Sequence, residues 1–204
     1  MSAPATFLAG LFDPSEIAVA GQSDGGDVVS ALGYNSCCSA GPAATHIQAV
    51  AVLSGAENSG WFTGSWFATP GPPLLVAQGT NDACNAPPLS TALYDAAPAA
   101  GGKYFLTLLG ADHLAGYTAA GASSSAVAAA TTAFFDLYLH HGKATSASVI
   151  AAGTTTVSQM TDSASAPTLK AVPVTWSYNP GTSLDPCSLT FAGPPGSTTT
   201  TAAG

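Results

Sequence analysis

Residues 17–34 read IAVAGQSDGGDVVSALGY, and this stretch decides the fold. It begins with a short apolar run of β-forming character, passes through a glycine-bounded turn with Ser23 at its apex, and continues as a helix-like segment. Backbone that folds back on both sides of a serine needs small neighbours, and Gly21 and Gly25 supply them. Ser23 alone satisfies Gly-x-Ser-x-Gly, so the sequence predicts a strand, a sharp turn and a helix.

Ser23 has two candidate partners further along the chain. A serine hydroxyl becomes a strong nucleophile when a histidine accepts its proton and a carboxylate fixes the tautomer of that histidine. Residues 72–82 (PPLLVAQGTND) predict a buried strand ending at Asp82, and residues 103–113 (KYFLTLLGADH) predict another ending near His113. The order serine, aspartate, histidine therefore favours a nucleophilic site over an ordinary Gly/Ser turn.

The other acids and histidines suit structural roles better. Asp24 and Asp27 lie on the turn and the helix themselves, where a side chain points the wrong way to hold the histidine from behind. Asp112 adjoins His113 and faces away from it if the segment is extended. The remaining histidines begin a predicted strand or end a predicted helix, where they suit the helix dipole: His46, His140 and His141.

These motifs resemble the α/β-hydrolase superfamily, above all secreted serine esterases of the cutinase, lipase and polyester-hydrolase type, with dienelactone hydrolases more distant. The resemblance spans about residues 11–142 and is carried by AGQSDGG, GTNDACNAP and GADH. It implies Ser23 as the nucleophile, His113 as the base, Asp82 as the acid and the backbone N–H of Asp24 as an oxyanion donor. It also implies cleavage of carboxylic esters through an acyl-enzyme, without a cofactor.

The predicted fold class is α/β, with a mainly parallel sheet of about four strands and flanking helices. Residues 46–53 predict another strand buried on both faces, and residues 88–97 and 123–141 predict amphipathic helices. Together with the strands at Ser23, Asp82 and His113, these elements make up a catalytic core assigned to residues 1–144.

One departure from the family concerns the start of the fold. Several strands normally precede the nucleophile, whereas Ser23 follows only 22 residues here, so we expect a truncated or minimal α/β-hydrolase fold. Its first strand, at residues 17–20, would be an exposed edge that favours self-association. The second oxyanion N–H would have to come from residues 35–45 or from the C-terminal extension.

The composition changes after residue 144. Short β-like runs at 154–157, 169–178 and 189–191 alternate with Pro, Gly, Ser and Asp, and the chain ends in GSTTTTAAG. Residues 145–204 therefore predict a short β-rich extension or stalk, with no chemistry of its own.

An aromatic cluster lies within a long predicted loop, residues 57–73. Either this loop packs onto its own core, or it forms an apolar wall beside Ser23 that binds acyl or aryl groups. On the second interpretation the substrates are small or polymeric apolar esters, polyesters among them. The substrate-binding residues would then be Gln22, Trp61, Phe62 and Trp66, with Phe67 alongside.

The net charge of the chain limits the classes of partner that it can bind. Three lysines and no arginine stand against eleven acids, giving a net charge of −8, which argues against nucleic acid and anionic membranes. No apolar stretch is long enough to span a bilayer, and MSAPATFLAG has no signal-peptide pattern. Low charge with much Ala, Gly, Ser and Thr is more typical of a secreted protein.

The four cysteines fit an oxidising compartment and lack metal-ligand spacing, so no metal site is expected. Cys37 and Cys38 are adjacent and would need a distorted peptide to bond to each other, so we expect one of them to bridge to Cys84. Buried free thiols are the alternative.

The sequence leaves two other functions open besides ester hydrolysis. The protein is then either a non-catalytic binding or structural module that keeps the triad residues, or an acyltransferase on the same triad.

Overall fold

The computed structural model describes residues 13, 15–39, 46–55, 62–118, 120–140 and 144–170. Five strands form one sheet in the order β1-β2-β3-β4-β5, with β1 to β4 parallel and β5 antiparallel to β4. Their bounds are Ile17–Gln22, Ile47–Leu53, Leu74–Gly79, Lys103–Leu108 and Ser158–Thr161. The predicted α/β class with a mainly parallel sheet is confirmed.

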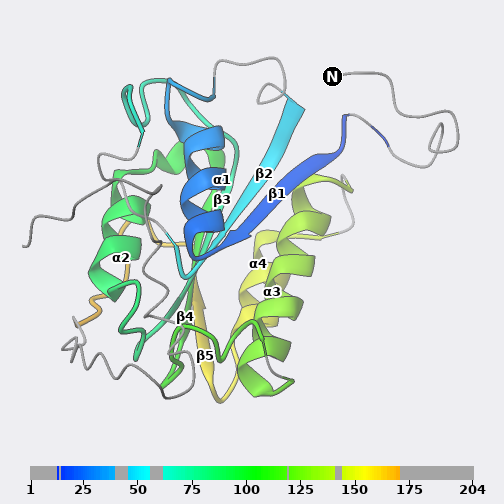
Figure 1. Ribbon diagram of the computed structural model, residues 1–204. Helices are drawn as coiled ribbons and strands as arrows, with labels where there is room; N and C mark the ends of the chain where they lie inside the picture. The colour runs from blue at the N-terminus through cyan, green and yellow to red at the C-terminus, as the bar shows by residue number, and fades with distance from the viewer. Residues whose placement is uncertain are drawn as a thin grey trace, which may run out of the picture.

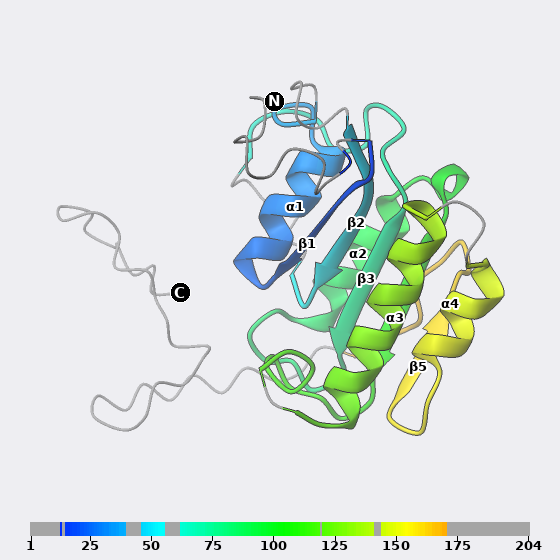
Figure 2. The same cartoon turned by 90° about the vertical axis from the view of Figure 1, so that its right-hand side faces the viewer.

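Helices cover both faces of this sheet (Figures 1 and 2). α1 and α2 lie on one face and α3 and α4 on the other, because consecutive parallel strands joined by crossovers of one hand place their connecting helices on the same side. No helix in the described ranges is both long and apolar enough to cross a membrane. The four helices α1 to α4 span, in order, Asp24–Tyr34, Pro87–Ala96, Ala122–Tyr138 and Ser146–Gly153.

β3 and β4 are buried along their whole length and β2 is buried over residues 49–52, which explains the largely apolar sequences of these three strands. In β2, Ala49 and Ala51 pack towards α3, whereas Val50 and Val52 pack towards α1 and α2. The two resulting cores hold the sheet rigidly, so the loops that follow the strands have fixed starting points.

The predicted boundary at residues 144/145 is wrong for the first part of the proposed extension. Residues 146–153 form α4, which packs on α3, and residues 158–161 form β5 of the main sheet. The predicted strand at 154–157 is instead the bend before β5. Small residues dominate SASVIAAG, so its weak periodicity could not separate helix from strand. The predicted β-like runs after residue 170 lie outside the described residues.

β1 lies at the edge of the described sheet and pairs with β2, as expected from the sequence. The carboxyl ends of the four parallel strands share one edge, so Ser23 after β1, Ser54 after β2, Thr80 after β3 and Leu109 after β4 begin neighbouring loops. Side chains far apart in sequence can meet there.

Candidate active site

Ser23 occupies a strained turn between β1 and α1. Its φ of 55° and ψ of −128° are rarely adopted by residues with a side chain. The turn is held because the Ser23 N–H donates to the Leu53 carbonyl at 3.0 Å and its own carbonyl accepts from the Gly26 N–H at 2.7 Å. Ser23 is also the N-cap of α1, yet its Oγ makes no capping bond. The hydroxyl therefore remains available for another partner.

That partner is His113. Ser23 Oγ lies 2.9 Å from His113 Nε2, and His113 Nδ1 lies 3.0 Å from Asp82 Oδ2. Asp82 is fully buried and His113 is 6% exposed. With Nδ1 protonated and donating to the carboxylate, Nε2 is free to accept the serine proton. The structure thus brings together the three side chains that the sequence singled out.

The Asp82 carboxylate is held on both oxygens. Oδ1 accepts the backbone N–H groups of Cys84 and Asn85, each at 2.9 Å. Oδ2, which faces His113, also accepts from Gln78 Nε2 at 3.0 Å. Gln78 is itself oriented by the Ser90 hydroxyl, which donates to its Oε1 at 2.5 Å. The acid therefore cannot rotate without breaking several bonds.

The role of Gln78 in holding Asp82 was not predicted, although the sequence contains a feature that points to this residue. It is the one polar side chain of β3, LLVAQG, and it is completely buried. A buried amide needs partners, and a strand end beside Asp82 is where they could be found.

Asn85 and Tyr117 were also not predicted from the sequence. The former donates to the Ser54 carbonyl at 2.6 Å, and the hydroxyl of the latter lies 2.9 Å from Ser54 Oγ, so both tie neighbouring loops together.

Gln22, assigned to substrate binding from the sequence, lies directly against the histidine. Its Nε2 is 3.3 Å from His113 Nε2 and donates to the His113 carbonyl at 3.3 Å. It precedes Ser23 at the end of β1, so it borders both Ser23 and His113.

Asp24 begins α1, and its backbone N–H belongs to the first turn, where amides have no acceptor within the helix. An anion beside Ser23 would also meet the positive end of the helix dipole. The predicted second donor was placed in residues 35–45 or in the C-terminal extension, and residues 40–45 lie outside the described residues. The described part of this range, residues 35–39, follows the other end of α1, about 16 Å along an eleven-residue helix.

The predicted aromatic wall is not beside the serine. Trp66 bridges to Asn35, the Phe67 N–H donates to the Tyr34 carbonyl at 2.8 Å, and Phe62 packs edge-on against Trp66. All three therefore lie at the far end of α1 from Ser23. Trp66 and Phe67 pack against the core there, and Phe62 packs on Trp66. Trp61 lies outside the described residues.

Asp112, His140 and His46 take no part in the chain of hydrogen bonds from Ser23 to Asp82. Asp112 accepts the N–H groups of Leu114 and Ala115 and so shapes the loop after His113. His140 lies 2.8 Å from Asp136 on the exposed end of α3, and His46 is exposed before β2. His141 lies outside the described residues.

The predicted disulfide between Cys84 and the Cys37–Cys38 pair is wrong. Cys37 bonds to Cys38 across a trans peptide, and Cys84 is also in a disulfide.

One group of side chains has the spacing of metal ligands. The ligand atoms of Asp82, Cys84 and His113 lie within 4.8 Å of one another. However, the sulfur is oxidised and the other two atoms bond to each other, so this donor set does not suit a metal.

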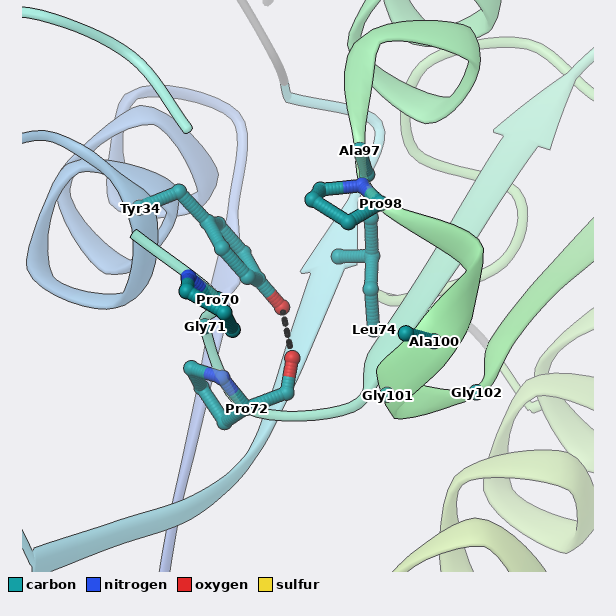
Figure 3. Close-up of a pocket in the computed structure, with 10 residues that line it drawn as sticks. All are labelled: Tyr34, Pro70, Gly71, Pro72, Leu74, Ala97, Pro98, Ala100, Gly101 and Gly102. Atoms are coloured by element: carbon teal, nitrogen blue, oxygen red, sulfur yellow. Dashed lines mark hydrogen bonds between the residues drawn. The ribbon is translucent and has the colours of Figure 1, made fainter. Parts of the chain in front are cut away.

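A cavity of about 150 Å³ lies at the opposite edge of the sheet from Ser23 (Figure 3). Tyr34 points across it and donates to the Pro72 carbonyl at 3.0 Å. Burial raises the pKa of the Tyr34 hydroxyl well above its usual value, which makes it a poor acid or base. The other lining residues are apolar or glycine, so this cavity offers no reactive group.

The two motif glycines should respond differently to alanine. A Cβ on Gly21 would press against the Gly25 carbonyl, which is backbone and cannot move aside, whereas a Cβ on Gly25 would meet nothing within 4 Å. Gly21→Ala should lower the free energy of unfolding by roughly 3 kcal/mol, the upper part of the usual range for overpacking. Urea unfolding followed by circular dichroism measures this loss.

Gly25→Ala is the matched control. It should leave stability unchanged or raise it by about 0.5–1 kcal/mol, because alanine favours the helix. Equal losses in the two variants would mean that the turn is not closed as described.

Comparison with known proteins gives no assignment. No protein-family model matches the chain, and no curated protein matches it. The geometry of the site therefore carries the functional argument.

Proposed function

We propose that the protein is a serine hydrolase that cleaves carboxylic esters through an acyl-enzyme intermediate. The observation that carries this proposal is the chain of two hydrogen bonds, Ser23 to His113 at 2.9 Å and His113 to Asp82 at 3.0 Å. A nucleophile, a base and an orienting acid from three strand ends meet at the distances that proton transfer requires.

In acylation, Ser23 Oγ bonds to the ester carbonyl carbon while its proton passes to His113 Nε2. The carbonyl oxygen becomes an oxyanion, to which the Asp24 N–H donates. The carbon–oxygen bond to the alcohol then breaks, the leaving oxygen takes the proton from Nε2, and the alcohol departs. Asp82 stabilises the imidazolium that forms between these two proton transfers.

In deacylation, water takes the place of the alcohol. His113 removes a proton from the water as its oxygen bonds to the acyl carbon, and the second tetrahedral intermediate expels Ser23 Oγ. The serine recovers its proton from Nε2, and a carboxylic acid is released. No redox step or group carrier is needed for this sequence.

The arrangement of elements supports a finer assignment of the fold. The serine follows β1, the aspartate follows β3 and the histidine follows β4, with helices on both faces of the sheet. This chain order at the carboxyl edge of a parallel sheet is the α/β-hydrolase order, so we assign the chain to a minimal form of that fold.

A fluorophosphonate probe tests the proposal on the intact protein. Because Ser23 is activated by His113, it should be phosphonylated within minutes, and mass spectrometry should locate the adduct on the peptide that contains it. The same preparation should hydrolyse p-nitrophenyl butyrate with saturation kinetics.

Two results would redirect the proposal. Absence of both labelling and turnover would favour a non-catalytic module that keeps the triad residues. Labelling accompanied by preferential capture of the acyl group by added butanol, rather than by water, would make the protein an acyltransferase.

A further inference from the structure

An open groove of about 610 Å³ lies beside the triad, within the roughly 300–1,000 Å³ typical of small-molecule sites. It is formed by the ends of β1 and β2, the loop after His113 and the first part of α3. The larger lining side chains are Gln22, Leu53, Tyr117 and Val127, and the others are Gly, Ala, Ser or Thr.

Two lining residues touch the triad directly. Gln22 has its Nε2 3.3 Å from His113 Nε2, and the Leu53 carbonyl accepts the Ser23 N–H at 3.0 Å. The groove therefore borders Ser23 and His113 through these two residues, unlike the cavity at Tyr34 on the opposite edge of the sheet.

The lining carries no charge at neutral pH. It contains no acid, lysine or histidine, and burial raises the pKa of the Tyr117 hydroxyl, which is also paired with Ser54. A charged ligand group would lose its hydration here without gaining a partner, whereas an alkyl or aryl group would gain by leaving water.

We infer that this groove binds the apolar alcohol part of the ester, an inference that rests on the proposed function. The leaving oxygen must take its proton from His113 Nε2, so the alcohol has to lie on the histidine side of the scissile bond. Gln22 borders both that nitrogen and the groove, whereas the oxyanion donor lies at the start of α1. Alkyl and aryl alcohols are thus the leaving groups that the site selects.

Two ester series separate the alcohol from the acyl side. In butyrates of ethanol, butanol and hexanol, kcat/KM should rise about threefold for each added methylene, as expected for partial burial of a CH₂ group. Ala128 is exposed on α3 and lines the groove. Ala128→Trp should fill the groove and lower the ratio of hexyl to ethyl butyrate at least tenfold, while the ratio of ethyl hexanoate to ethyl butyrate stays the same.

Ala129→Trp is the matched control, because Ala129 is also exposed on α3 but does not line the groove. It should leave both ratios within twofold of wild type. The fluorophosphonate labelling rate reports an intact triad in each variant, and Ala128→Met replaces the tryptophan if that variant does not label.

Each remaining outcome overturns the inference. Loss of selectivity in the acyl series would make the groove an acyl site, and unchanged ratios in both series would show that it is not a subsite. If wild type hydrolyses none of these esters, the proposed function itself is wrong, and the inference is lost with it.

Discussion

Ser23→Ala should lower kcat for a soluble ester on the order of 10⁶-fold and abolish fluorophosphonate labelling. The loss is large because no other described side chain occupies the nucleophile position 2.9 Å from His113 Nε2. His113→Ala should cost about as much, since nucleophile and base act as a unit and the serine hydroxyl is inert without a proton acceptor. Steady-state hydrolysis of p-nitrophenyl butyrate measures both losses.

The other histidines provide controls for this prediction. His140→Ala and His46→Ala should keep kcat within about twofold of wild type, because both side chains are exposed and away from the triad. A loss at His46 as severe as that at His113 would show that the base has been chosen wrongly. Labelling that persists in Ser23→Ala would exclude Ser23 as the nucleophile.

Asp82→Asn should lower kcat about 10⁴-fold while KM changes little. An amide nitrogen in place of Oδ2 would face two donors, Gln78 Nε2 and His113 Nδ1–H. In place of Oδ1 it would face the N–H groups of Cys84 and Asn85. Both orientations leave a buried donor unpaired, so the free energy of unfolding should also fall by about 2 kcal/mol.

Asp112→Asn is the control for Asp82→Asn. It also removes a carboxylate close to His113 in the sequence, but not the one that bonds to His113. Asp112 is exposed and accepts only the N–H groups of its own loop among the bonds described for it, so the variant should retain turnover within twofold. Urea unfolding and p-nitrophenyl butyrate kinetics are measured on both variants. Full activity in Asp82→Asn would mean that another carboxylate orients His113.

Much of the fold could be predicted because its elements carry strong local patterns. The apolar strand before Ser23, the glycines around it and the buried runs before Asp82 and His113 fix three strand ends of one sheet. A parallel sheet brings such ends to one edge, so the meeting of these side chains follows from sequence and topology together.

Of the two interpretations of the aromatic loop, the binding wall beside Ser23 fails for a topological reason. A connection between parallel strands starts at the carboxyl edge of the sheet and must return to the amino edge. Phe62, Trp66 and Phe67 come late in the connection from β2 to β3, so they lie at the amino edge, away from Ser23. Composition suggested a binding wall, but position along the connection decides which edge a residue reaches.

The Cys37–Cys38 bond, the groove and Gln78 have weaker sequence signals. Adjacent cysteines suggest separate partners, and a groove depends on how α3 lies against the ends of β1 and β2. The buried glutamine could have been noticed as a polar residue in an apolar strand, yet its partners come from loops whose paths the sequence does not specify.

The exposed carboxylate of Asp24, next to Ser23, would act on the product of the proposed reaction. An ester arrives uncharged, but the acid it becomes ionises above a pH of about 4 to 5 and then carries the same sign as Asp24 and the rest of this acidic protein. The negative charge of Asp24 would therefore repel the carboxylate product from the site beside Ser23. Salt largely screens charges more than about 8 Å apart at physiological ionic strength, so release of the product from the proposed site would be fastest at low ionic strength.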